Sequence, residues 1–267
     1  MNLILKGKRP LILIMLALNI GACATTSQLS PNPKQTSVLK TQIAVEYIKS
    51  GNIDAAKNAL DDAVEKDPNN ALAYMMLGVT YQLDSSKESL KKADIAFKKA
   101  ISLEPENPQI RNNYGQYLFF VENYKAAITE FYFAANSVGY SGRDTAYSNL
   151  GYSYYNIGDE DKAKSAFISS LKINPRLPDS LLGIAGVYYD LGSITEATSI
   201  YEDFSHLVPK QNRDAKALWL GIRIAHVNED HVEKSSLINL LSTKYAKSKE
   251  YKSYLNQRNK KDAVWVP

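Results

Sequence analysis

Apolar residues recur with a helical period along most of this chain. In one segment, small and apolar residues fall at positions i, i+3, i+4 and i+7 of a helix: Tyr147, Leu150, Gly151 and Tyr154. The next segment carries a matching stripe: Ala163, Ala166, Phe167, Ser170 and Leu171. Small side chains on facing stripes let two helix backbones approach closely, so the pattern predicts a helical hairpin.

The predicted hairpin repeats every 34 to 37 residues. One alanine in each second helix marks the period: Ala56, Ala93, Ala127, Ala163 and Ala197. Small residues recur in the first helices with about the same period: Ala44, Gly78, Gly115, Gly151 and Ala185. Aromatic residues recur where they can fill the space between units: Phe97, Phe131, Phe167 and Tyr201. Prolines, which cannot continue a helix, close four units: Pro68, Pro105, Pro175 and Pro209.

This layout resembles the tetratricopeptide repeat, which has Gly or Ala at position 8, Ala at position 20 and Pro at position 32. The resemblance implies an all-α fold, a right-handed superhelical solenoid of about six helix pairs. It predicts units at approximately 37–70, 71–107, 108–143, 144–177, 178–211 and 212–246. Residues 247–267 are then a C-terminal cap or tail, whose apolar end is either tucked against the last helix or frayed.

Details of the repeat support predicted helix boundaries. Good N-cap residues occupy repeat position 16 of five units: Asn52, Ser89, Asn123, Asp159 and Ser193. Ser193 together with Glu196 fits a capping box. Unit 2 has three extra residues within 83–92, which predicts a longer turn. Residues 137–143 contain two glycines, which predicts a loose joint that is either a hinge or a tolerated insertion.

The start of the chain has the pattern of an export signal. Basic residues precede the apolar residues 10–20, and residues 20–22 lead into Cys23, the only cysteine. The apolar run is much shorter than the ~20 residues that cross a bilayer as a helix, so residues 1–22 are predicted to be cleaved. The motif resembles a lipoprotein lipobox, which implies a covalent lipid on Cys23 and no other cofactor. The alternative is an ordinary secretory signal beside an unmodified thiol.

Residues 23–36 are predicted to be the lipidated cysteine and a flexible tether, because the stretch is polar, contains two prolines and lacks periodicity. Such a coil would hold the folded body ~20 Å from the lipid. Ala24 follows the cysteine. Among Gram-negative lipoproteins an Asp there signals retention in the inner membrane, so the resemblance implies the outer membrane, facing the periplasm.

Charge and motif content argue against several classes of function. Three of the 32 Lys and Arg residues lie in the predicted signal, which leaves 29 basic residues against 28 acidic ones. This near-neutral balance predicts no nucleic-acid binding, which needs a clustered basic face. The three histidines lack the spacing of metal ligands, and no nucleophile elbow or phosphate-binding loop is present. We therefore predict no enzyme activity, no metal and no small-molecule substrate.

A solenoid of helix pairs offers a groove lined by its first helices. In peptide-binding tetratricopeptide proteins, the lining falls at repeat positions 2, 5, 9 and 12. The candidate groove residues in units 1 to 5 are Val45, Ile48, Leu72, Met75, Val79, Phe119, Tyr152, Tyr155 and Tyr189. These positions carry no Lys or Arg, which disfavours a carboxylate clamp and favours an extended or helical partner segment. Leu72, Met75 and Val79 are the preferred contact. The alternative is that some of the candidate residues only pack against a neighbouring helix or the C-terminal cap.

The combination of lipobox, tether and six units is similar to the type IV pilus biogenesis/stability lipoproteins, the PilF/PilW pilotin family. Residues 217–225 at the start of unit 6 and residues 114–118 in unit 3 agree with that family. The resemblance implies a scaffold that binds the secretin, the ring protein through which the pilus exits, and promotes its localisation and multimerisation. An adaptor for peptidoglycan hydrolases or another envelope assembly complex is the alternative. An envelope enzyme with an unrecognised site is a third hypothesis.

Overall fold

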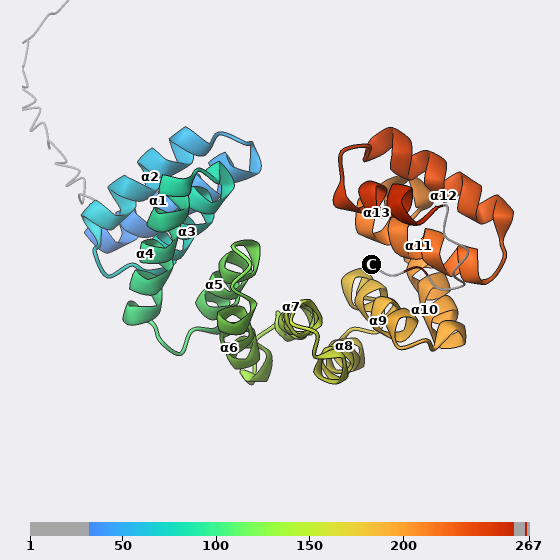
Figure 1. Cartoon of the computed structure of the whole chain (residues 1–267). Helices are drawn as coiled ribbons and strands as arrows, with labels where there is room; N and C mark the ends of the chain where they lie inside the picture. Colours follow the sequence, from blue (N-terminus) through green and yellow to red (C-terminus); the bar gives the residue numbers. More distant parts are fainter. Residues whose placement is uncertain (1–31, 259–264, 266–267) are drawn as a thin grey trace, which may run out of the picture. The chain divides into compact units, whose positions relative to one another are not determined.

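A computed structural model describes residues 32–258 and residue 265 (Figure 1). Cys23, the predicted signal and most of the predicted tether lie outside these residues. Within them the chain forms thirteen α-helices and one short 3-10 turn. The first six are α1 (Pro33–Lys49), α2 (Ile53–Lys66), α3 (Ala71–Asp84), α4 (Lys87–Leu103), α5 (Pro108–Phe120) and α6 (Tyr124–Asn136). The others are α7 (Arg143–Asn156), α8 (Glu160–Ile173), α9 (Pro178–Asp190), α10 (Ile194–Leu207), α11 (Ala215–Val227), α12 (His231–Lys244) and α13 (Lys249–Gln257).

The first twelve helices form six consecutive pairs, and α13 packs against α11 (Figure 1). Each pair also contacts the next pair along the chain, through contacts such as α6 with α7 and α8 with α9. The first helices of neighbouring pairs touch one another from α1 through α11. This order is that of a helical solenoid, and it places the first helices side by side. None of the described helices is both long and apolar enough to span a membrane.

Close packing within each pair follows from the small residue in its first helix. A Cβ built on Gly151 would lie 2.7 Å from the ring of Phe167, which comes from the second helix of the same unit. Gly78 and Gly115 meet Phe97 and Phe131 in the same way. The ring of Phe167 also reaches the next unit, because a Cβ on Gly183 would lie only 2.3 Å from it. The recurring aromatics therefore fill the space between units, as the sequence predicted.

Helix starts agree with the predicted caps in three of five units. Asn52, Asn123 and Asp159 each accept a hydrogen bond from a first-turn amide through the side chain. Ser193 stands at the start of α10 but makes no side-chain cap hydrogen bond, so the predicted capping box is absent. Ser86, not Ser89, caps α4. The extra residues of unit 2 thus lengthen α4 at its start, and the predicted longer turn is wrong.

Two further predictions about connecting segments are corrected. Helix α1 begins at Pro33, so residues 33–36 belong to the helix and not to the tether; proline suits the first helical position because its missing N–H is not needed there. The joint at residues 137–143 is packed at Tyr140 and Arg143 rather than loose throughout, while Val138 is 95% exposed. Tyr140 packs against the small residues at the α6–α7 contact, and the Arg143 Nε donates to the Ala135 carbonyl at 2.9 Å.

The C-terminal end is tucked against the last unit at its tryptophan. Trp265 is 3% exposed and packs in one cluster with Trp219, Leu218 and Ile222 of α11. Trp219 occupies the position that holds a small residue in the other units, and its ring lies 6.1 Å from that of Trp265. The sixth unit is therefore capped by α13 and by the chain's own indole.

Candidate partner-binding groove

The preferred cluster in units 1 and 2 is only partly available to a partner. Leu72 is 40% exposed, but Met75 is 3% exposed and packs among Ala71, Phe97 and Tyr114 in the core. Val79 is half-buried against the same core. Met75 is therefore a core residue, because its long side chain fills the space between units 2 and 3. The prediction that it lines an open groove is wrong.

The predicted groove residues of unit 1 are also half-buried. Val45 and Ile48 lie on α1 with intermediate exposure, and Ile48 packs against the core between α2 and α3. The largest exposed apolar residues of this helix lie elsewhere on its surface, at Val38, Leu39, Ile43 and Tyr47. The residues predicted for unit 1 are thus less exposed than other apolar residues of the same helix.

Two adjoining pockets lie further along the first helices. One has a volume of about 160 Å³ and the other about 210 Å³. Both include Tyr152 of α7, Leu182 of α9 and Lys216 of α11, so they form one cleft. We call this feature the inner cleft. It brings together three of the predicted groove residues, Tyr152, Tyr155 and Phe119, with residues that the repeat positions had not selected.

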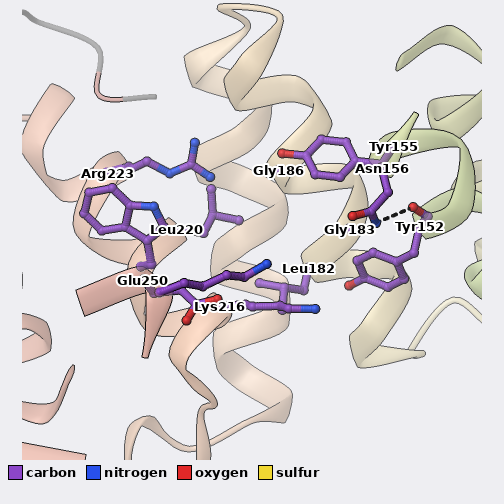
Figure 2. Close-up of a pocket in the computed structure, with 12 residues that line it drawn as sticks. Tyr152, Tyr155, Asn156, Leu182, Gly183, Gly186, Lys216, Leu220, Arg223 and Glu250 are labelled. Carbon is purple, nitrogen blue, oxygen red and sulfur yellow. Dashed lines mark hydrogen bonds between the residues drawn. The ribbon is translucent and has the colours of Figure 1, made fainter. Parts of the chain in front are cut away.

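The pocket at the C-terminal side of the inner cleft is bordered by four helices (Figure 2). Its lining residues are Tyr152, Tyr155, Asn156, Leu182, Gly183, Gly186, Lys216, Trp219, Leu220, Arg223, Lys249 and Glu250. Figure 2 shows Arg223, Leu220 and Glu250 across the pocket from Tyr155 and Asn156. The Asn156 Nδ2 donates to the Tyr152 carbonyl at 2.8 Å.

The two tyrosines of α7 are fixed by hydrogen bonds to α9. The Tyr152 hydroxyl donates to the Asp179 carbonyl at 2.7 Å, and its ring meets the Phe167 ring edge-on at 5.0 Å. The Tyr155 hydroxyl donates to a carboxylate oxygen of Asp190. Burial raises the pKa of both phenols, and nearby carboxylates raise it further. Both groups are therefore neutral hydroxyls that present an aromatic face and hold α7 against α9.

Arg223 is the most buried charge in the cleft. It is 4% exposed, and its Nη1 donates to the Asp190 Oδ1 at 2.9 Å. Its guanidinium lies 4.6 Å from the centre of the Tyr189 ring and 5.8 Å from that of Trp219. Paired with Asp190 and stacked on aromatic rings, the guanidinium is held in a single orientation at the wall of the pocket.

Tyr189 is not a free groove residue. It is fully buried, and its hydroxyl accepts a hydrogen bond from the Trp265 backbone N–H at 3.1 Å. Trp265 also stacks on the His226 ring, with centroids 3.9 Å apart. Trp265 thus covers the wall at Tyr189, and this predicted contact is corrected.

The other pocket carries acidic groups. It is lined by Gln116, Phe119, Phe131, Asn149, Tyr152, Asp179, Leu182, Asp214 and Lys216. Burial raises the pKa of Asp179 above its ordinary value, and the neighbouring Asp214 raises it further. This pocket therefore has two carboxylates and Lys216, whereas the pocket at the C-terminal side has three basic residues and Glu250.

The predicted groove did not include these basic residues, because repeat positions were assigned only in units 1 to 5. With Trp219 at position 8, repeat positions 5, 9 and 12 of that unit are Lys216, Leu220 and Arg223. All three line the cleft. Basic residues therefore line the cleft, although none occupies the selected positions of units 1 to 5. Lys249 and Glu250 come from α13, outside the repeat, and no register predicts them.

Comparison with known proteins agrees with this fold. Residues 41–87, 71–107 and 144–177 match the tetratricopeptide repeat family. The chain is 28% identical over 253 residues to the type IV pilus assembly protein PilF of Pseudomonas aeruginosa, covering 92% of this chain and 97% of that protein. This chain is a tetratricopeptide-repeat homologue of PilF. The resemblance and the all-α superhelical fold predicted from the sequence are confirmed.

Solved structures support the same relationship. The structure of Pseudomonas aeruginosa PilF superposes with a TM-score of 0.73, covering 84% of this chain and 98% of that one. PilW, described as a widely conserved type IV pilus biogenesis factor, is 25% identical, with a TM-score of 0.71 over 83% of this chain and 99% of that one. The MamA protein, at 24% identity and a TM-score of 0.53, shares the fold over 65% of this chain and 92% of that one.

Proposed function

We propose that this protein is a type IV pilus biogenesis factor that acts by binding another envelope protein. The observation that carries the proposal is the end-to-end homology to PilF, which covers nearly all of both chains. The structure supports a binding role because it has a cleft along its first helices, the surface that helical repeat proteins use for partners. The proposed mechanism is scaffolding, without catalysis, a metal or a small-molecule substrate.

The finer proposal is that the protein is a pilotin for the secretin. Cys23 would carry lipid and anchor the chain in the outer membrane, facing the periplasm. Each buried CH₂ of an acyl chain contributes about 0.8 kcal/mol, and two or more chains give stable anchoring. Anchoring raises the effective concentration of the cleft near a partner that has to enter the same membrane. The secretin subunit would be located there and assembled into its multimer.

Deletion of the gene tests this function. We expect the heat-resistant secretin multimer to be lost from immunoblots of the deletion strain while secretin monomer is still made. Expression of the intact chain should restore the multimer. Undiminished multimers in the deletion strain would refute the pilotin role. Recovery of a peptidoglycan hydrolase, and not secretin, with the tagged chain would favour the adaptor alternative instead.

The lipid anchor is tested by Cys23→Ser. The change lies outside the folded repeats, so we expect normal circular dichroism but loss of the protein from the outer-membrane fraction. Ala24→Ser is the matched control, because it alters the neighbouring residue and leaves the thiol. A Cys23→Ser protein that remained in the outer membrane would show that the anchor is not this cysteine.

A further inference from the structure

Three side-chain atoms on residues that line the inner cleft lack a hydrogen-bond partner among the described residues. They are the Nε of Arg223, the Nε1 of Trp219 and the Nδ2 of Asn149. All three are N–H donors. Buried polar groups in native proteins are almost always hydrogen-bonded, so a group of unpaired donors in one cleft calls for an acceptor from outside the chain.

Arg223 and Trp219 are the strongest of these because both are almost entirely buried, at 4% exposure each. They lie one helical turn apart on α11, and the guanidinium faces the Trp219 ring at 5.8 Å. Asp190 accepts from Nη1 of Arg223 and leaves its Nε unpaired. The salt bridge therefore fixes the guanidinium without saturating its five N–H donors.

The charge around these donors favours an anionic acceptor. The pocket that contains them is lined by Lys216, Arg223 and Lys249 against a single carboxylate, Glu250. Lys216 and Lys249 are not buried, and neither forms a salt bridge with another described residue. Asp190 offsets part of the charge of Arg223. Glu250 and the neighbouring Asp179 offset part of the charge of the two lysines. The pocket is still lined by three basic side chains against one carboxylate, so it complements a negative group.

We propose that the inner cleft recognises an acidic side chain in an extended segment of the partner protein. The carboxylate accepts hydrogen bonds from Arg223 and Trp219 and lies between Lys216 and Lys249. The neighbouring apolar residues of the segment pack on Tyr152 and Leu182, which belong to both pockets of the cleft. This inference rests on the proposed partner-binding function and specifies the chemistry that the partner presents.

The geometry assigns the carboxylate to a side chain rather than to a chain end. The donors belong to the middle of α11, with Lys216 one turn before Trp219 and two turns before Arg223, and with Lys249 contributed by α13. Basic residues thus flank the donors from two different helices. A segment that lies in the inner cleft can continue from this pocket over Tyr152 into the second pocket and present the acid from its side.

A displayed library of random ten-residue peptides tests the proposal even while the partner is unidentified. The library is fused through the peptide C-terminus, so that its only carboxylates are side chains, and it is selected on the full-length chain in a mild detergent. We expect Asp or Glu to be enriched at one position. The double variant Lys216→Glu/Lys249→Glu should lose this preference and select Lys or Arg there. The control variant Lys91→Glu/Lys172→Glu makes the same charge change at exposed positions away from the cleft. It should select the same peptides as the unaltered chain.

Selected peptides without a shared acid, identical selection by both double variants, or no selection at all would overturn the proposal. A second library with free C-termini tests the source of the carboxylate. Enrichment in that library alone would show that a chain end is recognised and would overturn the side-chain assignment. Because secretin is absent from both selections, failure of this inference is distinguishable from failure of the pilotin function.

Tryptophan fluorescence provides a direct readout of the same site. The chain has two tryptophans, Trp219 and Trp265, and they stack on each other. In a Trp265→Phe background the emission reports on Trp219 alone. A synthetic copy of a selected peptide should shift that emission, and replacing its acid by Gln should weaken binding by at least about tenfold. Arg223→Lys keeps the charge but removes the Nε donor and should weaken binding similarly, with unchanged circular dichroism. Equal affinities for the Glu and Gln peptides would contradict the assignment.

Discussion

Backbone conformation at single residues explains part of this chain's repeat pattern. The turns within units 1, 4 and 5 place glycine in the left-handed region, as at Gly158 with φ 79°. Unit 3 has Glu122 in the equivalent turn at φ 61°, and unit 6 has Glu229 at 57°. A side chain with a Cβ is strained there, whereas glycine is not.

The first prediction follows from that strain. Glu122→Gly should raise the free energy of unfolding by about 1 kcal/mol, because a non-glycine residue in the left-handed conformation costs roughly that amount. Urea denaturation followed by circular dichroism measures the change. Glu122→Ala removes the charge but keeps the Cβ, so it should give no comparable gain. Equal stabilisation by both variants would mean that charge, not backbone strain, is responsible.

A second prediction compares two glycines of α9. Gly183→Ala should destabilise the protein by about 1–3 kcal/mol, since its Cβ would overlap the Phe167 ring and overpacking costs that much. Gly186→Ala meets nothing within 4 Å and should be neutral or slightly stabilising, because alanine favours a helix over glycine. Thermal unfolding of the two variants separates steric overlap from helix propensity. A similar loss of thermal stability in both variants would contradict the packing argument.

At the scale of elements, helices are joined by tertiary contacts that differ between the two ends of the repeat region. Unit 1 leaves Leu39, Ile43 and Tyr47 of α1 partly exposed, because α1 is the first described helix and no earlier described unit packs on it. Unit 6 is covered by α13 and by Trp265. The C-terminal cap therefore provides stability that no repeat position supplies.

The third prediction concerns this cap. Trp265→Ala should destabilise unit 6, toward the low end of the roughly 3–5 kcal/mol measured for losing a buried aromatic side chain. Hydrogen exchange should speed up in α11 and α13, while amides of α3 and α4 remain protected. Trp265→Phe keeps an aromatic ring against His226, so it should lower the stability of unit 6 by less. Unchanged exchange in α11 would show that the indole contributes nothing to the cap.

At the scale of the whole molecule, stability is shared between neighbouring units. The buried clusters extend across unit boundaries, as where Leu150 of unit 4 packs with Phe131 of unit 3. In a solenoid each unit is stabilised mainly by its neighbours, so a defect at one interface should weaken the adjacent units first.

The fourth prediction tests this coupling. Leu150→Asp buries an unpaired charge between units 3 and 4, which is strongly unfavourable. We expect exchange to accelerate first in α5 to α8 and least in α11 and α12. Leu191→Asp introduces the same residue at a position that is 43% exposed and should leave exchange unchanged. Uniform acceleration along the chain with Leu150→Asp would indicate a single cooperative unit instead.

Prediction of the groove from sequence was less successful than prediction of the helices, and particular residues show why. Repeat positions identified Tyr152, Tyr155 and Phe119, which do line the inner cleft. The same positions selected Met75 and Tyr189, which are buried. A position in a repeat fixes the face of a helix, but whether that face stays open depends on what else the chain lays against it.

The helix pairs, their order and their close packing could be predicted from the residues alone. Those features arise from local periodicity and from small residues opposite aromatic ones, which recur within a few tens of residues. Which part of the predicted groove is accessible depends on contacts between distant parts of the folded chain. Trp265 reaches Tyr189 across 76 positions, and α13 contributes Lys249 to the pocket that Arg223 of α11 also lines. Such contacts depend on where distant segments meet in the folded chain, and no local pattern encodes that.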